Sequence, residues 1–568
     1  MKKLKLVLLT AVISPLFFIA CNAQNNSNSR NAVSDSLDFV NSFNVKLPDI
    51  KNPVFKKDTF NISDFGGKAD GITLNTKAIN DAITACNKNG GGVVLVESGL
   101  WLTGPVQLQS NVNLHLKSNA VLLFTADKSQ YKLIESNWEG KKAVRNQSPI
   151  SGNNLQNIAI TGKGIIDGNG DVWRAVKKEK LTESQWKKLV ASGGVVRDGR
   201  MWMPSESFAL GDKTKDASAI VPGKTLVDYQ DMKDFFRPNL LVLTNCKTIL
   251  LEGVTFQNSP AWCLHPLICE DLTLRNLTVK NPWYAQNGDG VDVESCKNVV
   301  IEGSTFDVGD DGICIKSGRD EDGRKRGIPT ENVIVRYNTV YHAHGGFVIG
   351  SEMSGGAKNL YVYNNSFIGT DIGLRFKTTR GRGGVVENIY VSNINMKDIA
   401  GEAIRFDMYY AAKDPVPLVG EQREAPKTVM MPVSEATPQF KNFFIKNVFV
   451  HGAEKALFIR GLPEMNIKNI NLENLVVQAD KGIEIIEAQG VNIKNMSLLT
   501  KDTTQLISLQ NSSAVTFDQL KPLSNYSSFL NISGEKSADI NFLNSNIKDA
   551  KQKTSFTFGA KQTALKIK

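Results

Sequence analysis

Residues 332–337 read Asn-Val-Ile-Val-Arg-Tyr, and residues 359–364 read Asn-Leu-Tyr-Val-Tyr-Asn. Each copy begins with a polar residue and continues as an alternating run of β-branched, aliphatic or aromatic residues, which is typical of a strand. Related copies begin at Thr248, Asp271, Asn298, Asn388, Asn442 and Asn469. The intervals between starts from Thr248 to Asn388 are 23, 27, 34, 27 and 29 residues. This repeat predicts a solenoid, in which each unit packs mainly against its neighbours.

The spacing favours one kind of solenoid. A period near 27 residues is too short for a four-stranded propeller blade, and the copies lack the leucine ladder of leucine-rich repeats. We therefore expect an all-β fold, a right-handed parallel β-helix of about ten coils, each with about three short strands and a rise of about 4.8 Å. The amphipathic run 78–86 is expected to be a helix that covers the open N-terminal end of the stack.

The repeat also sets the expected boundaries. Residues 58–540 are expected to form the β-helix, and an insertion over about 170–238 interrupts it, with a helix near 181–190. A second excursion runs from about 411 to 438. Residues 541–568, where the pattern fades, are expected to be a polar C-terminal tail.

The N-terminus has the features of an export signal. Three lysines precede an apolar run over residues 6–19 that is too short to span a bilayer, so residues 1–20 are expected to be a signal peptide. The sequence Phe18-Ile-Ala-Cys21 resembles the box cut by bacterial lipoprotein signal peptidase, which would leave a lipid on Cys21. Plain secretion with cleavage near Ala20 or Ala23 is the alternative. If Cys21 carries the lipid, residues 21–57 are expected to be the tether and linker of the lipoprotein. The expected location is the outer membrane or the periplasm.

Composition excludes few functions. The chain has 568 residues, of which 41% are hydrophobic and 22% charged, as in ordinary folded domains. Its formal net charge of +10 suits an anionic partner, although it can equally serve solubility. No Cys-x-x-Cys pair supports a structural zinc site, and most cysteines after Cys21 are expected to be buried free thiols. The six cysteines after Cys21 are Cys86, Cys246, Cys263, Cys269, Cys296 and Cys314.

Four short stretches, about one repeat apart, carry chemically reactive residues. They are Asn287-Gly-Asp289, Gly309-Asp-Asp311, Ala343-His-Gly345 and Arg375-Phe-Lys377. Aligning successive copies places Asp289 over Asp311 and Asp310 over His344, with Arg375 and Lys377 on the strand that follows. All of them should lie within about 15 Å, three coil rises, on one face.

Such a cluster has a chemical use. Close carboxylates repel one another, which keeps one protonated while the others stay ionised. Glycoside hydrolysis needs this asymmetry, because one acid protonates the leaving oxygen and one base activates water. Each motif alone is more often a turn or a solvated strand face, but their joint occurrence at coil spacing favours catalysis.

The four motifs together resemble glycoside hydrolase family 28, the polygalacturonases. That family has Asn-x-Asp, Gly/Gln-Asp-Asp, Gly-His-Gly and Arg-Ile-Lys, and its entry segment is similar to residues 64–71. The resemblance covers about residues 58–410. Gly288, Ala343 and Phe376 depart from the family pattern, but none of these changes removes a reacting group.

The resemblance implies a role for each residue. Asp310 would be the general acid, assisted by His344, and Asp289 with Asp311 would hold and deprotonate the attacking water. The reaction would invert the anomeric configuration, with no covalent intermediate, no metal and no cofactor. The implied substrate-binding residues are Arg375, Lys377, Asn287 and either Tyr409 or Tyr410.

We therefore expect a hydrolase of α-1,4-linked galacturonate in pectin. The insertion is large enough to wall off one end of a cleft, so exo action is expected. The expected partner is the acidic polysaccharide alone, for a monomer that binds no nucleic acid and reaches a membrane only through a lipid anchor. The alternatives are a hydrolase of rhamnogalacturonan or another pectin backbone, a calcium-dependent pectate lyase, and a non-catalytic glycan-binding β-helix.

Overall fold

The computed structural model describes residues 34–412, 429–547, 550 and 552–568. The chain divides into two compact units, 1–47 and 48–568. The described part of the first unit contains a short helix over 34–43, on which the rings of Phe39 and Phe43 lie 5.0 Å apart. The predicted signal peptide and Cys21 lie outside the described residues. Among the described helices, none has the length and apolar character needed to cross a membrane.

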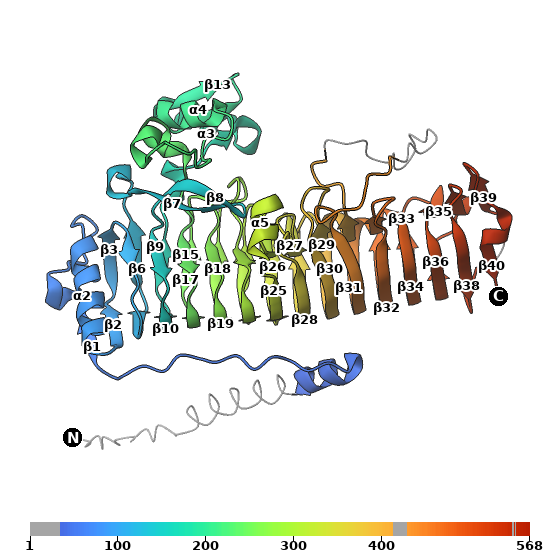
Figure 1. The fold of residues 1–568 in the computed structure, drawn as a ribbon, viewed down its shortest axis with the longest axis horizontal. Coiled ribbons are helices and arrows are strands. Elements are labelled where there is room, and N and C mark those ends of the chain that lie inside the picture. The colour runs from blue at the N-terminus through green and yellow to red at the C-terminus, as the bar shows by residue number, and fades with distance from the viewer. Residues whose placement is uncertain (1–33, 413–428, 548–549, 551) are drawn as a thin grey trace, which may run out of the picture. The chain divides into compact units, whose positions relative to one another are not determined.

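The second unit is the expected right-handed parallel β-helix (Figure 1). Its first column of strands is linked by successive parallel pairings from near residue 59 to the C-terminus. The stack is thus longer than the ten coils expected. The strands are β1 (Thr59–Asn61), β2 (Gly92–Val96), β5 (Val112–Leu116), β10 (Gln156–Gly162), β16 (Lys247–Glu252), β19 (Glu270–Arg275), β22 (Lys297–Glu302), β25 (Thr330–Arg336), β28 (Ala357–Ile368), β30 (Val385–Asp407), β31 (Gln439–Arg460), β32 (Ile467–Ala479), β34 (Ala488–Thr500), β36 (Ser513–Pro522), β38 (Ala538–Leu543) and β40 (Leu565–Ile567).

Two further columns complete the coils, and the long strands β28, β30 and β31 extend into them. The second column holds β3 (Gly99–Thr103), β6 (Ala120–Phe124), β11 (Ile165–Asp167), β17 (Thr255–Gln257), β20 (Thr278–Lys280), β23 (Thr305–Asp307) and β26 (Thr339–Tyr341). The third holds β4 (Val106–Gln107), β9 (Ile150–Asn153), β15 (Leu241–Thr244), β18 (Leu264–Leu267), β21 (Val291–Glu294), β24 (Asp311–Lys316), β27 (Gly345–Ile349), β29 (Leu374–Lys377), β33 (Lys481–Ile486), β35 (Gln505–Gln510), β37 (Ser528–Ser533) and β39 (Thr554–Thr557).

The polar residue that begins each copy of the repeat forms a ladder along the stack. Asn298, Asn332 and Asn359 each have a positive φ, between 56° and 58°, a conformation that asparagine tolerates better than most residues. The Asn332 amide donates to Asn298 Oδ1 at 3.1 Å, and the Asn359 amide donates to Asn332 Oδ1 at 3.3 Å. The asparagines therefore turn the chain and join neighbouring coils.

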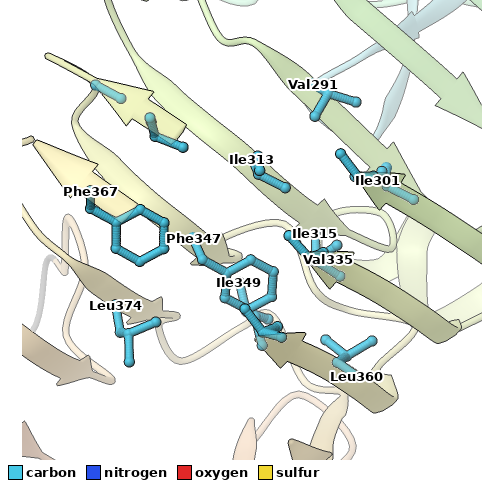
Figure 2. Packing of buried hydrophobic residues seen from close by; sticks show 14 of the residues in the cluster. Val291, Ile301, Ile313, Ile315, Val335, Phe347, Ile349, Leu360, Phe367 and Leu374 are labelled. Carbon is cyan, nitrogen blue, oxygen red and sulfur yellow. The ribbon is translucent and has the colours of Figure 1, made fainter. Parts of the chain in front are cut away.

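Inward-facing side chains fill the interior coil by coil. In the third column Val291, Ile313, Phe347 and Leu374 occupy equivalent positions on four successive strands, and all are fully buried (Figure 2). Each such burial contributes roughly 1.5–3 kcal/mol. Along β29 the buried Leu374 and Phe376 alternate with Arg375 and Lys377, so the same packing that builds the core orients these two cationic side chains outward.

The predicted capping helix is present as α2 (Thr76–Lys88), at the N-terminal end of the stack in Figure 1. Its apolar face, which includes Ile79, Ile83 and Cys86, is fully buried in the main core. All six described cysteines are buried and free, as expected.

The expected insertion is also present, between β11 and β15. Its elements are η3 (Gly170–Val172), β12 (Val176–Lys177), η4 (Lys178–Lys180), α3 (Glu183–Ala191), β13 (Val195–Arg197), β14 (Met201–Met203), α4 (Glu206–Lys213) and η5 (Leu226–Phe235). An antiparallel hairpin of β7 (Leu133–Trp138) and β8 (Lys141–Asn146) lies next to it, and α5 (Asp320–Arg326) follows β24. The remaining short helices are η1 (Ile62–Phe65), η2 (Lys128–Gln130) and η6 (Gln562–Ala564).

The expectation of a polar tail over residues 541–568 is wrong. Strand β39 pairs in parallel with β37, and β40 pairs with β38, so the coils continue almost to the C-terminus. The repeat was hidden because its last strands are short and carry lysine and threonine on their outward face.

Candidate active site

The three carboxylates meet at the beginning of adjacent third-column strands. Val291 pairs with Ile313 and Asp311 pairs with Gly345, which is the register that the repeat predicts. Carboxylate oxygens of Asp289, Asp310 and Asp311 lie within 4.8 Å of one another. The structure therefore brings together the acids that the sequence singled out.

Asp311 is the ionised member of the group. Its side chain is 1% exposed, and its two oxygens accept from Arg375 Nη1 at 3.0 Å and Lys377 Nζ at 2.8 Å. Burial by itself would raise the pKa of Asp311, but the charges of Lys377 and Arg375 outweigh it and hold that pKa far below its usual range. The predicted substrate-binding cations thus also neutralise one carboxylate of the cluster.

Asp289 is the carboxyl group that resists ionisation. It is 3% exposed, and its Oδ1 has no hydrogen-bond partner among the described residues. Burial, followed by the charges of Asp292 and Asp310, raises the pKa of Asp289 well above its ordinary value. The expected difference in pKa between neighbouring carboxyl groups is therefore present. It lies between Asp289, whose pKa is raised, and Asp311, whose pKa is lowered.

His344 is joined to Asp310 as expected. His344 Nδ1 lies 3.1 Å from Asp310 Oδ1, and the His344 backbone N–H donates to the Asp310 carbonyl at 2.9 Å. On its other side, Nε2 lies 3.7 Å from an oxygen of Asp371. The hydrogen bond to Asp310 raises the pKa of His344, so this contact favours the charged imidazolium.

The structure separates the two candidate tyrosines. The ring of Tyr410 lies beside the cations, with its centroid 4.8 Å from Lys377 Nζ and 5.8 Å from Arg375 Cζ. Tyr409 is 5% exposed and packs against Arg380 and Arg460 instead. Tyr410 is therefore the tyrosine of this site, and Tyr409 is a buried supporting residue.

Asn287 is held by a residue that the sequence reasoning missed. Arg237, at the end of the insertion, donates to Asn287 Oδ1 at 2.9 Å and to the Gln286 carbonyl at 2.8 Å. A third bond joins Arg237 to the Pro260 carbonyl at 3.1 Å. Arg237 thereby fixes the turn that leads into Asp289. Nothing local in the sequence marks this arginine, because its partners are about 25 and 50 residues away.

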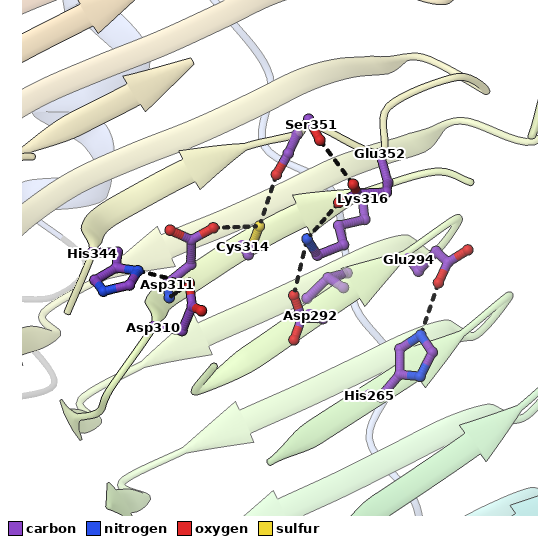
Figure 3. A network of polar contacts seen from close by, with 12 residues as sticks. His265, Asp292, Glu294, Asp310, Asp311, Cys314, Lys316, His344, Ser351 and Glu352 are labelled. Carbon is purple, nitrogen blue, oxygen red and sulfur yellow. Dashed lines mark hydrogen bonds and ion pairs between the residues drawn. The ribbon is translucent and has the colours of Figure 1, made fainter. Parts of the chain in front are cut away.

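A buried network of charges continues along the same strands (Figure 3). Lys316 Nζ lies 2.9 Å from Glu352 Oε2 and 3.5 Å from Asp292 Oδ1, and all three residues are buried. Burial raises the pKa of Asp292 well above its ordinary value. The period of two could have identified Asp292, because it alternates with the core residues Val291 and Val293.

The three acids could also be considered as cation ligands. Both oxygens of Asp311, however, already bind cationic side chains, and Asp310 Oδ1 accepts from the Asp311 backbone N–H at 3.0 Å. This donor set fits proton transfer and charge stabilisation better than a calcium site, which needs six to eight oxygen ligands.

Comparison with known proteins agrees with this geometry. The model of the family "Glycosyl hydrolases family 28" matches residues 228–420. An exo-poly-α-D-galacturonosidase of Dickeya chrysanthemi is 30% identical over 414 residues, which cover 71% of this chain and 64% of that protein. A probable polygalacturonase of Vitis vinifera is 33% identical over 344 residues, covering 59% of this chain and 60% of that protein. The chain thus matches less than two thirds of the length of these two relatives.

A solved structure is similar over more of its length. The hyperthermoactive exopolygalacturonase from Thermotoga maritima is 30% identical, with a TM-score of 0.58, and the match covers 77% of this chain and 89% of that one. A polygalacturonase from Erwinia carotovora, at 21% identity and a TM-score of 0.53, shares the fold.

Proposed function

Because the chain belongs to glycosyl hydrolase family 28, we propose that it hydrolyses α-1,4-linked galacturonate in pectin or pectic oligosaccharides from a chain end. One observation carries the proposal: the Asp310–His344 pair lies beside a carboxylate, Asp311, that two cations keep ionised. A proton donor beside an ionised oxygen is what hydrolysis of a glycosidic bond requires.

Each group has a place in the reaction. Asp310 gives a proton to the glycosidic oxygen as the bond from that oxygen to the anomeric carbon breaks. Asp289 and Asp311 hold the water whose oxygen forms the new bond to that carbon, and the ionised Asp311 takes the proton that the water loses. For the next cycle the proton on Asp311 leaves to solvent, and the charged His344 passes a proton to Asp310 and regains one from solvent.

The cations supply selectivity for an acidic sugar. Arg375 and Lys377 lie next to the reacting carboxylates, and both are only slightly exposed, so a galacturonate carboxylate would share them with Asp311. Retention of His344, Arg375 and Lys377 favours galacturonate over rhamnogalacturonan at the scissile position. The Tyr410 ring lies beside both cations and completes this side of the site.

The stereochemical outcome rests on the family resemblance. The carboxylate oxygens lie within 4.8 Å, whereas inverting pairs are usually about 6.5–9.5 Å apart. We expect the β-anomer as the first product of α-linked substrate, followed in real time by proton NMR. Appearance of the α-anomer first would show retention and a covalent intermediate.

The insertion supports cutting from a chain end. Tyr284, in the turn that leads to the site, packs with Trp186 and Trp202 of the insertion, and Lys180 lies 4.6 Å from the Trp283 ring. The insertion thus packs on one side of the catalytic coils, and two relatives above are named for exo action. With a galacturonate hexamer as substrate, we expect one product size from the first minutes, and a ladder of sizes would show endo action.

The same incubation separates hydrolysis from a lyase reaction. Cleavage should persist in a chelator and give no ultraviolet-absorbing unsaturated ends. Calcium-dependent cleavage that yields such ends would overturn the hydrolase, and binding without any cleavage would identify a glycan-binding β-helix.

We also propose export with lipidation of Cys21, which would place the enzyme at the outer membrane or in the periplasm. The basic and apolar N-terminal segment and the residues that precede Cys21 support this. Labelled fatty acid should be incorporated into the full chain and not into a Cys21→Ala variant; equal labelling would refute the anchor.

A further inference from the structure

A groove of about 1050 Å³ lies on the sheet that carries the active site, yet its lining includes none of the reactive residues. Its floor comes from β9, β15 and the end of β18, through Ser151, Thr244 and Leu267. One wall is β7, and α5 contributes Lys325 and Arg326. We call this space the β7 groove. Its volume matches that of ordinary ligand sites.

The hairpin lines the β7 groove through residues of both strands and also contacts the insertion. Strand β8 faces the insertion, through the Ala143–Ala219 bridge and a hydrogen bond from Arg145 to the Arg237 carbonyl. Trp138, at the end of β7, stacks on Trp262 of the coils, with ring centroids 5.3 Å apart. The groove and the reactive cluster share no lining residue, although both lie on the third column of strands.

The charges that line the groove favour an anionic ligand. Four cationic residues outnumber two acidic ones, Glu135 and Asp322. Lys132 and Lys142 are exposed, and no ion pair joins either of them to another described residue. Lys325 and Arg326 already pair with Glu321 and Glu294. The two hairpin lysines are thus the charges available to a ligand.

The floor of the groove has the chemistry of a sugar site. Ser151, Asn153 and Thr244 offer hydroxyl and amide groups, and they lie among Val242 and Leu267. Alternating polar and apolar floor positions suit a pyranose ring, which has polar edges and an apolar face. Asn137, in the β7 wall, has a buried Oδ1 with no hydrogen-bond partner among the described residues.

We propose that the β7 groove is an accessory binding site for an acidic oligosaccharide segment, with uronate carboxylates on Lys132 and Lys142. This rests on the proposed function, since the substrate polymer supplies the ligand. Arg326 in the groove holds Glu294 at 2.6 Å, and Glu294 ends the strand that follows Asp289. Five residues of extended chain, roughly 17 Å, therefore separate the groove from the reacting carboxylates. A polymer held there stays close to the active site.

Calorimetric titration of the full-length Asp310→Asn variant with trigalacturonate tests the site. We expect two binding events, and Lys132→Ala with Lys142→Ala should weaken one of them by at least tenfold. Lys468→Ala with Lys521→Ala, a matched pair of exposed lysines elsewhere on the coils, should change neither. A single event that the hairpin substitutions leave unchanged would overturn the proposal. A neutral galactotriose that binds the groove equally well would overturn the acidic ligand.

Activity in the Asp310-containing protein separates this proposal from the proposed function. The Lys132/Lys142 variant should cleave trigalacturonate normally, while its KM for long polygalacturonate rises several-fold. If the variant and the unsubstituted protein have the same KM for the polymer, the accessory site is refuted, while the proposed hydrolase activity is not. Absence of hydrolysis by the unsubstituted protein would refute the proposed function, and the titration would still decide whether the groove binds acidic sugars. Thermal unfolding of the variant should be unchanged, because both lysines are exposed.

Discussion

At the scale of single residues, the site depends on how three close carboxylates are kept in different states. Two cations fix the charge of Asp311, while burial and the neighbouring Asp292 and Asp310 disfavour the charge of Asp289. Asp310 lies within hydrogen-bond distance of His344. The sequence motifs identify these acids, but their states depend on contacts between coils.

The roles of Asp310 and Asp289 can be separated with substrates that differ in their leaving groups. A general acid matters most when the leaving group is poor. Asp310→Asn should therefore lose several orders of magnitude in kcat on galacturonate oligomers and much less on an aryl α-galacturonide. Asp289→Asn should be equally impaired on both substrates. The reverse pattern would make Asp289 the acid, in line with its raised pKa.

The pH profile of kcat/KM should reflect the two charged pairs. The raised pKa of His344 means that its charged form, and the stability it adds, is fully present below about pH 6.5 and is lost as pH rises through the folded pKa. The alkaline limb should therefore lie above pH 6.5. The lowered pKa of Asp311 keeps it ionised below its ordinary 3.8. Lys377→Ala should move the acid limb to higher pH, and an unmoved limb would show that Lys377 does not set that charge.

At the scale of elements, the insertion and the asparagine ladder act on the site from different directions. The insertion holds the turn before Asp289 through Arg237, whereas the ladder fixes the spacing of the coils on another side of the stack. The sequence marks the ladder by its repeat and the insertion only as an interruption.

Arg237→Ala should impair catalysis without unfolding the coils. Loss of hydrogen bonds from a charged donor costs about 1.5–3 kcal/mol, which is about 10–150-fold in kcat/KM if the turn before Asp289 loosens. Arg200→Ala, at an exposed arginine of the same insertion, serves as the control and should leave kcat/KM nearly unchanged. Equal kinetics for the two variants would remove Arg237 from the positioning of this turn.

Substitution within the ladder tests whether conformation or the amide matters more. Asn332 has a φ of 58°, where alanine is strained by about 1–2 kcal/mol and glycine is not. Asn332→Ala should therefore lower the thermal midpoint more than Asn332→Gly. If Asn332→Gly lowers the thermal midpoint as much as Asn332→Ala, the side-chain hydrogen bonds to Asn298 and Asn359 contribute more to stability than the backbone conformation does.

At the scale of the whole molecule, stability comes from stacking, so each end of the coil stack needs cover. Helix α2 covers the N-terminal coils with Ile79 and Ile83. At the other end β39 and β40 extend the stack beyond Phe542, whose ring stacks on Phe517 at 4.7 Å.

Removal of residues 544–568 should therefore destabilise the protein and promote association. It would expose the pairing edges of β37 and β38, which β39 and β40 cover in the full chain. We expect a lower thermal midpoint and oligomers by size-exclusion chromatography, whereas Lys561→Ala in the same segment should behave like the parent. If the truncated protein is as stable and monomeric as the parent, these residues do not stabilise the coil stack and behave as the tail that the sequence suggested.

The sequence was sufficient to predict the parallel β-helix, the capping helix, the insertion and the register that unites Asp289, Asp310, Asp311 and His344. It could do so because each coil repeats a local pattern whose phase fixes which residues share a face. Three-dimensional contacts were needed to show that Tyr410 rather than Tyr409 lies beside Arg375 and Lys377, that Arg237 holds Asn287, and that burial raises the pKa of Asp289. Those outcomes depend on burial and on contacts between residues far apart in the chain, which leave no periodic trace in the sequence.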